Sequence, residues 1–412
     1  MKRGAAVGLA LLLAMPGYAV VAHADELEEP VAEEIVEDGE AQDDIEFEKI
    51  NKLTLDDALE RALNENSSLM LLKYQLEIIE NQEGGTSKDL RDLRFDIRDL
   101  ERMRDRLRKL PTNTFQERYA IQQQLESLED VIDALEEALE QIKSGKVTLS
   151  YTEEEARANI QMGTTATYMQ LLMAKEERAL KENVLKTKER EVNALKRRYE
   201  LGLASYHDYQ VELREIERLQ TEIAQADKQW QQEMAAFALS LGIVYHPDLE
   251  LEPVRLGTLE LVTQEKETEE LVKNLFKYKR QEEKIRLAEY MRDRVYSDDD
   301  STTYEKNEAD LQVKVEKETL EQIKLDAETA IQQLYYEVEK GYQDMLNAER
   351  EWRYAQDDMK ALERRYALGV VSKLQYELAQ VQLEQAKFAY EMAKQAYFLK
   401  TKQVELLELG VI

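Results

Sequence analysis

A nine-residue segment that occurs twice constrains the fold of this chain more than any other feature. Residues 197–205 (RRYELGLAS) reappear as residues 364–372 (RRYALGVVS), at an offset of 167 residues and with six positions identical. A glycine at the end of a helix adopts a left-handed conformation that other residues resist, and a serine three positions later can accept amide protons of the next helix. The segment therefore predicts a tight reversal between two helices, used twice.

The composition favours helices throughout. With 5 Pro and 14 Gly in 412 residues, the chain has too few turn residues for an all-β fold or a doubly wound sheet. The absence of Cys excludes disulfides, Cys-containing zinc sites and cysteine catalysis. A formal net charge of −30 makes the chain as a whole a poor partner for nucleic acids or anionic lipid headgroups.

The N-terminus has the pattern of an export signal. Residues 1–24 contain Lys2 and Arg3, an apolar run and the small-residue ending Ala22-His23-Ala24, which together predict a cleaved signal peptide. Residues 25–50 follow as an acidic segment, with 13 acidic and no basic residues up to Glu48, and we expect this leader to be disordered. No later run is apolar for long enough to predict a membrane-spanning helix.

Apolar residues at three- and four-residue spacing predict the remaining organisation. We expect repeat 1 over 51–246, a linker over 247–258 and repeat 2 over 259–412. Repeat 1 should contain an extra coiled-coil hairpin over 87–143 with its tip near Pro111 to Thr114. The helices are expected over 55–83, 87–110, 125–143, 152–199, 206–241, 262–295, from after Asp300 to 366, and 373–409, with 147–151 extended. The fold class is therefore all-α, built from elongated helical hairpins in two tandem repeats.

The last predicted helix has two apolar seams. Leu374, Leu378 and Phe388 belong to one, whereas Tyr390 and Tyr397 belong to another with seven-residue spacing. A helix with two seams packs against neighbours on two sides, which favours a sheet or cylinder of helices, or an oligomer.

The opening segment and the doubled turn resemble the TolC-like outer-membrane efflux protein family. The matching residues are Leu53–Leu63 with Asn66, and the two Arg-Tyr-x-x-Gly-x-x-Ser turns with their following helices. The resemblance implies three chains that form a hollow helical cylinder for solutes from an inner-membrane transporter. It also implies membrane-spanning strands in each repeat, but residues 87–143 and 296–310 are too charged or too short for them. We therefore expect a member of the family without a transmembrane β-barrel.

The resemblance also implies a set of residues on the hairpin turns that meet a membrane-fusion adaptor protein. They are Arg198, Tyr199, Gly202, Ser205 and Asp208 in the first turn, and Arg365, Tyr366, Gly369 and Ser372 in the second. Asp208, like Gln375 in the second copy, lies three residues after the serine and predicts a capping box. The alternative is a generic helical hairpin in which Asp208 is only a cap residue. Val370 and Val371 stand where the family tends to place a basic residue, which argues against a charge-locked aperture.

No catalytic, cofactor or metal motif is present, so we expect neither an enzyme nor a bound cofactor. His207 and His246 lack partner ligands and are interpreted as solvated or packed. Two functions stay open: a non-enzymatic conduit or adaptor-docking component of an efflux or secretion assembly, and a structural coiled-coil scaffold of the cell envelope. Both imply an exported protein, in the periplasm, associated with an outer membrane, or on the extracytoplasmic face of a single-membrane bacterium. The first also implies a homo-oligomer.

Overall fold

The structure is a computed structural model that describes residues 49–110 and 114–412. The predicted signal peptide, all but the last two residues of the predicted acidic leader, and residues 111–113 of the predicted tip lie outside the described residues.

Helices make up most of the described chain, so the predicted all-α class is confirmed. None of the helices in this part of the chain combines the length and apolar composition that crossing a membrane requires. In chain order the elements are β1 Lys52–Leu53, α1 Leu55–Asn64, α2 Ser67–Arg108, α3 Phe115–Glu200, α4 Tyr206–Ser240, β2 Glu250–Leu251, α5 Thr268–Asn274, α6 Phe276–Ser297, α7 Thr303–Ala367 and α8 Lys373–Leu409.

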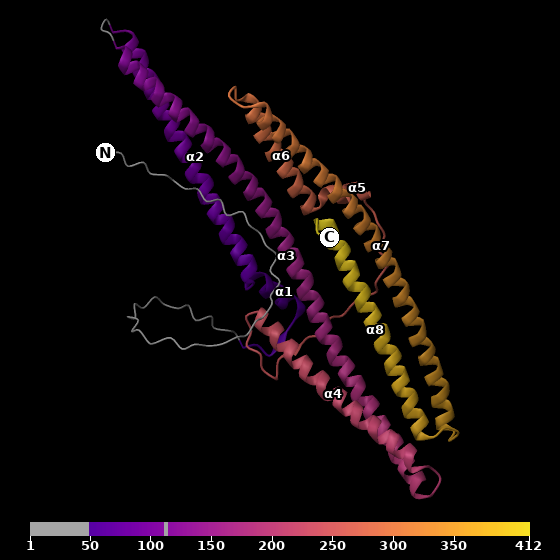
Figure 1. The fold of residues 1–412 in the computed structure, drawn as a ribbon. Coiled ribbons are helices and arrows are strands. Elements are labelled where there is room, and N and C mark those ends of the chain that lie inside the picture. The colour runs from indigo at the N-terminus through magenta and orange to yellow at the C-terminus, as the bar shows by residue number, and fades with distance from the viewer. Residues whose placement is uncertain (1–48, 111–113) are drawn as a thin grey trace, which may run out of the picture. The chain divides into compact units, whose positions relative to one another are not determined.

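Helix α3 is the element around which the others pack. It contacts α1, α2, α4, α6 and α8, while α7 packs against α6 and α8 (Figure 1). The hairpins α3–α4 and α7–α8 therefore meet along α3 and α8. An ion pair and a hydrogen bond also join α3 to α8. Arg190 forms an ion pair of 2.5 Å with Glu377, and the Asn183 amide donates to the Glu384 carboxylate at 3.1 Å. The two repeated hairpins therefore pack side by side.

Two predicted helix ends are wrong, because α2 and α3 continue through their glycines. Gly84 and Gly85 lie inside α2, and Ser144-Gly145-Lys146 and residues 147–151 lie inside α3. None of these three glycines has a positive φ. A glycine inside a helix costs only about 1 kcal/mol relative to alanine. Packing of α2 against α3 outweighs that cost, and Lys146 also pairs with Glu83 across the two helices at 3.2 Å.

The actual break in the first predicted helix comes earlier, at Glu65 between α1 and α2. Asn66 caps α2 there, since its side-chain oxygen accepts from the N–H groups of Ser68 and Leu69. Thr152, where a new helix is predicted to begin, instead donates its hydroxyl to the Thr148 carbonyl within α3. At the start of α1 the Thr54 hydroxyl caps the helix, because it accepts from the Asp57 N–H at 3.1 Å.

The helix predicted over 262–295 is also divided. Residues 262–267 are not helical, and α5 and α6 are separated at Leu275, whose ψ of 134° is extended. The backbone here binds to distant parts of the chain: the Val262 N–H donates to the Tyr397 hydroxyl at 3.0 Å, and the Phe276 N–H donates to the Gly410 carbonyl at 2.8 Å. These contacts replace the helical hydrogen bonds that the sequence pattern predicts.

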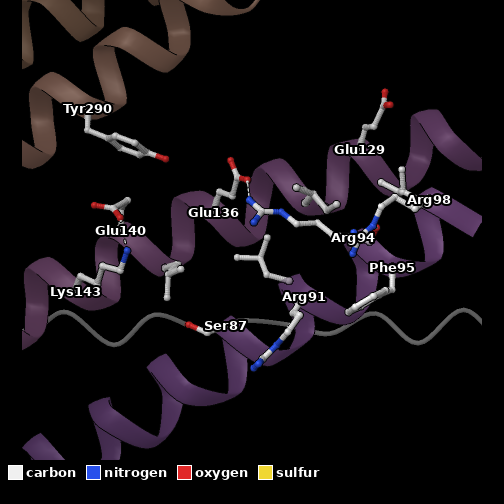
Figure 2. Close-up of a pocket in the computed structure, with 14 residues that line it drawn as sticks. Ser87, Arg91, Arg94, Phe95, Arg98, Glu129, Glu136, Glu140, Lys143 and Tyr290 are labelled. Carbon is white, nitrogen blue, oxygen red and sulfur yellow. Dashed lines mark hydrogen bonds and ion pairs between the residues drawn. The ribbon is translucent and has the colours of Figure 1, made fainter.

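A groove of about 1040 Å³ opens between α2 and α3, with Tyr290 of α6 at its side (Figure 2). Its charged side chains largely pair with one another. Arg94 of α2 binds Glu136 of α3 at 2.6 Å, and Lys143 binds Glu140 at 2.7 Å. The first ion pair joins α2 to α3, whereas the second lies within α3.

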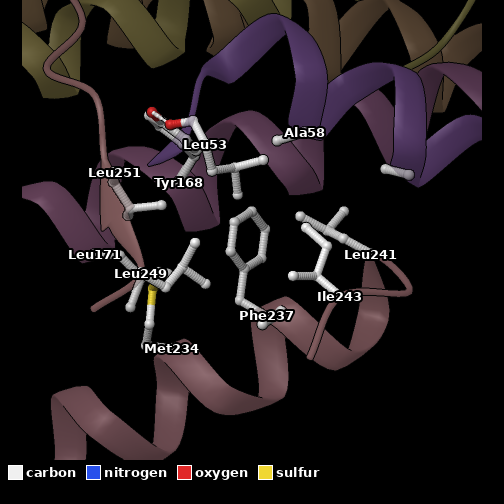
Figure 3. Close-up of a cluster of buried hydrophobic side chains, with 12 residues drawn as sticks. Leu53, Ala58, Tyr168, Leu171, Met234, Phe237, Leu241, Ile243, Leu249 and Leu251 are labelled. Atoms are coloured by element: carbon white, nitrogen blue, oxygen red, sulfur yellow. Dashed lines mark hydrogen bonds between the residues drawn. The ribbon is translucent and has the colours of Figure 1, made fainter. Parts of the chain in front are cut away.

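The most deeply buried apolar cluster joins the segment before α1 to the segment that follows α4. Strand β1 pairs in parallel with β2, which places Leu53 opposite Leu251. Both leucines pack with side chains from α1, α3 and α4, including Tyr168 and Phe237 (Figure 3). The Tyr168 hydroxyl lies 2.8 Å from both the Leu53 and the Glu252 carbonyl oxygens, so its proton serves two backbone acceptors. Burial raises the pKa of Tyr168 to about 12.

A second buried tyrosine holds the connection between the repeats from the other side. The Tyr397 hydroxyl of α8 donates to the Glu260 carbonyl at 2.7 Å and accepts from the Val262 N–H. Lys394 adds a bond from its ammonium group to the Leu256 carbonyl at 2.8 Å. Residues 252–262 are thus bound at one end by repeat 1 and at the other by repeat 2.

We predict that Tyr168→Phe lowers the free energy of unfolding by about 1–2 kcal/mol at pH 8, because the Glu252 carbonyl loses the Tyr168 hydroxyl as its donor and the Leu53 carbonyl keeps only the Glu252 N–H. The folded-state pKa of about 12 lies above the usual value of 10.0. The unfolded chain therefore releases this proton first, and the wild type loses stability as pH rises above 10, by up to about 1.4 kcal/mol per pH unit. Urea unfolding at pH 8 and pH 11 measures both effects.

The control is Tyr354→Phe, because Tyr354 is 59% exposed. The stability difference between wild type and Tyr168→Phe should shrink at pH 11, whereas Tyr354→Phe should follow the wild type at both pH values. A constant difference for Tyr168→Phe would show that the phenol has no raised pKa.

Candidate functional site

The first copy of the repeated segment forms a tight reversal between α3 and α4. Gly202 has a φ of +71°, in the left-handed region. Its N–H donates to the Tyr199 carbonyl at 2.8 Å, and the Leu203 N–H reaches back to the Arg198 carbonyl at 2.7 Å. The bond from Leu203 spans five residues, as in a Schellman motif that satisfies the last carbonyls of a helix.

The second copy repeats this geometry between α7 and α8. Gly369 also has a φ of +71°, its N–H donates to the Tyr366 carbonyl at 2.9 Å, and the Val370 N–H donates to the Arg365 carbonyl at 3.0 Å. The predicted double reversal is therefore confirmed at the level of individual backbone bonds.

The caps of the returning helices differ between the two copies. The Ser205 hydroxyl accepts from the Asp208 N–H at 3.0 Å, and the Ser372 hydroxyl accepts from the Gln375 N–H at 3.2 Å. Only the second copy forms a full capping box, because the Gln375 side-chain oxygen also accepts from the Ser372 N–H at 3.1 Å. The capping box predicted in both copies is thus wrong for the first. The Asp208 side chain is one methylene shorter than that of Gln375, which limits its reach back to the serine.

A stacked pair of tyrosines packs beside each turn, and the sequence analysis does not predict these two pairs. Tyr199 stacks on Tyr209 with ring centroids 6.0 Å apart, and Tyr366 stacks on Tyr376 at 4.6 Å. Tyr209 and Tyr376 are related by the same offset of 167 residues as the turns themselves. Extending the repeat alignment by a few residues beyond the serines would have revealed both partners.

The most exposed apolar side chains of each turn flank its glycine, and the predicted residue set omitted them. Leu201 and Leu203 are 74% and 68% exposed, and Leu368 and Val370 are 79% and 66% exposed. The side chains of Arg198 and Arg365 are also exposed, while their backbone carbonyls accept turn bonds. Each turn thus exposes two aliphatic side chains and, a few residues earlier in the chain, an arginine. Such a surface suits binding to a protein.

Both turns lie at the same end of the packed hairpins (Figure 1). The Arg190–Glu377 ion pair connects α3 to α8 shortly before Gly202 and shortly after Gly369. At about 1.5 Å per residue, the glycines lie roughly 18 Å and 12 Å along their helices from this ion pair. The structure therefore brings the two predicted sets of turn residues to one end, where a single partner surface can reach both.

The histidines fit their interpretation as packed or solvated residues. His246 is 9% exposed, and its Nε2 lies 2.6 Å from the Ile50 carbonyl, to which it donates. His207 is exposed beside the first turn. Within residues 49–110 and 114–412, no three His, Asp or Glu side chains gather as a metal site would require.

Comparisons with known proteins identify the fold. A scan against protein-family models gives no match, and a search of curated proteins gives none either. Among solved structures, the open state of the Neisseria gonorrhoeae MtrE outer membrane channel matches with a TM-score of 0.57 at 14% identity, covering 87% of this chain and 89% of that chain. The Campylobacter jejuni CmeC outer membrane channel matches with a TM-score of 0.55 at 12% identity, covering 87% and 86%.

A third match is the outer membrane protein VceC of Vibrio cholerae, with a TM-score of 0.54 at 12% identity over 87% of this chain and 97% of that chain. All three matched proteins are outer membrane proteins, and the first two are described as channels. The chain has the helical fold of TolC-like outer-membrane channels, as the resemblance of its opening segment and doubled turn implies.

We predict that Gly202→Ala and Gly369→Ala each lower the free energy of unfolding by about 1 kcal/mol, because alanine resists the left-handed conformation. Gly84→Ala, inside α2, should instead raise it by up to about 1 kcal/mol. No atom lies within 4 Å of a Cβ added at any of these positions, so the opposite signs isolate the backbone effect. Urea unfolding measures all three. Stabilisation by the turn substitutions would contradict the left-handed geometry.

Proposed function

We propose that this protein is a non-enzymatic component of an efflux or secretion assembly, acting as a helical conduit or adaptor-docking protein for export across the cell envelope. One observation carries the proposal: a fold shared with outer membrane channels over 87% of the chain contains two equally built turns at one end of its hairpins. The proposal places the protein outside the cytoplasm, consistent with the signal-peptide pattern of residues 1–24.

The turns are the proposed docking site for a membrane-fusion adaptor that connects to an inner-membrane transporter. Leu203 and Val370 supply exposed apolar surface at equivalent positions of the two copies. The neighbouring arginines Arg198 and Arg365 supply positive charge at the edge. An adaptor with apolar sockets surrounded by acidic side chains would complement both features.

The protein is further proposed to work as a homo-oligomer, a trimer by resemblance. Helix α7 supports this because it has apolar side chains on two opposite faces. One face is buried against α6 and α8 and includes Val313, Ile331 and Val338. The other is an exposed stripe that, at about 100° per residue, falls within an arc of about 80°. Its members, called the α7 stripe, are Tyr304, Leu311, Val315, Leu325, Tyr336 and Tyr354.

We predict that the wild-type protein forms an oligomer and that the double substitution Leu325→Glu with Tyr336→Glu weakens its association at least about 100-fold, because two charges would enter an apolar interface. Light scattering coupled to size exclusion measures the mass. Leu239→Glu is the matched control, since Leu239 is 63% exposed and lies on α4. A wild type that is a stable monomer would favour the alternative function, a structural coiled-coil scaffold of the envelope.

Docking is tested in cells that depend on this protein for export of a fluorescent dye. We predict that Leu203→Asp with Val370→Asp raises dye retention to the level of cells lacking the protein, because each buried charge weakens adaptor binding by roughly tenfold or more. Leu239→Asp should leave retention unchanged. Equal export by wild type and the double variant, with both proteins present at equal levels, would contradict the proposal that the turns bind the adaptor.

A further inference from the structure

The C-terminal end of α2 and the N-terminal end of α3 pack together and extend beyond the end of α6. Near its end, α6 is bound to α3 through Arg294, which lies 3.1 Å from Asp133 and 3.6 Å from Glu136. Helix α6 ends three residues later, at Ser297, whereas α3 begins at Phe115. At about 1.5 Å per residue, the α2–α3 pair continues roughly 20 Å past the end of α6 (Figure 1). We call residues 103–110 and 114–119 the α2–α3 end.

The α2–α3 end is basic, although the whole chain is strongly acidic. It contains five basic and two acidic residues, in a protein of net charge −30. Three of the cations, Arg106, Arg108 and Lys109, are exposed and form no ion pair with any described residue. A cation at a helix C-terminus interacts favourably with the helix dipole, but that effect falls off within one turn and leaves the charge open to solvent.

Exposed apolar side chains accompany these cations. Met103 and Leu110 of the α2 side are 54% and 51% exposed, and Phe115 and Tyr119 of α3 are 64% and 57% exposed. The rings of Phe115 and Tyr119 stack with centroids 6.4 Å apart. Arg106 and Arg108 point about 200° apart around the axis of α2, so positive charge is spread around the helix end instead of lining one groove.

We propose that the α2–α3 end binds the surface of a membrane rich in anionic lipids. Arg106, Arg108 and Lys109 would pair with lipid phosphates while Phe115 and Leu110 enter the boundary between headgroups and acyl chains. An end with exposed charges and apolar groups on several sides fits a fluid surface better than a protein socket, which requires fixed complementary positions. The contact is peripheral and independent of any transport activity.

The acidity of the rest of the chain does not oppose this contact. The acidic turn Asp298–Asp300 lies just after the end of α6, roughly 20 Å behind the α2–α3 end. At physiological ionic strength charges are screened over about 8 Å, so the local positive charge dominates at the membrane. The negative net charge therefore disfavours anionic lipids at the body of the protein and not at this end.

Co-sedimentation of the chain from residue 25 to 412 with vesicles tests the proposal. We expect binding to vesicles of phosphatidylglycerol and phosphatidylcholine, and little binding to phosphatidylcholine alone. Arg106→Gln with Arg108→Gln and Lys109→Gln should lower the partition coefficient about 100-fold, at roughly fivefold per cation. The matched control, Lys186→Gln with Arg214→Gln and Lys228→Gln, removes three exposed cations from α3 and α4 and should bind like wild type. Equal loss in both triple variants would overturn the proposal, as would equal binding to both vesicle types.

A second measurement separates a lipid surface from a soluble acidic partner. Phe115→Trp should show a blue shift of its added fluorescence with anionic vesicles, because the ring leaves water, and no shift with polyglutamate. A blue shift that the basic-to-glutamine variant abolishes would support insertion at the lipid boundary. Tight binding of polyglutamate without vesicle binding would instead identify an acidic protein as the partner and overturn the membrane contact.

Discussion

The left-handed backbone at Gly202 and Gly369 is the constraint on which the arrangement of the other helices depends. It reverses the chain within a few residues, so α4 returns along α3 and α8 returns along α7. Once each pair is antiparallel, α3 and α8 can pack together and bring both turns to one end. The stacked tyrosines Tyr199–Tyr209 and Tyr366–Tyr376 strengthen the same reversal from its sides.

The two buried tyrosines Tyr168 and Tyr397 solve a separate problem, the joining of the repeats. A connection without regular structure has backbone groups that need partners. Tyr168 binds its first part through the Glu252 carbonyl, and Tyr397 binds its last part through Glu260 and Val262. Different residues therefore set the hairpin geometry and attach the linker. The turns stay exposed, while the buried clusters lie farther along the hairpins.

Particular residues show where sequence reasoning succeeded and failed at the candidate site. Gly202 and Gly369 were identified with their caps and their repeat, because these signals lie within a few residues of one another. Leu203 and Val370 were missed because exposed apolar residues cannot be distinguished from buried ones until the turn geometry is known. The basic α2–α3 end was missed for a related reason: a net charge averages over the chain, whereas binding depends on charges within about a Debye length.

By itself, the sequence determined the helical class, the two reversals and most helix boundaries, since helix formation and capping depend on residues three or four positions apart. The tertiary structure decided whether glycines such as Gly84 and Gly145 end a helix, because packing of α2 on α3 offsets their intrinsic cost. It also decided the pairing of β1 with β2 and the break at Leu275. Those features depend on partners more than a hundred residues away, and the local spacing of apolar residues does not predict such contacts.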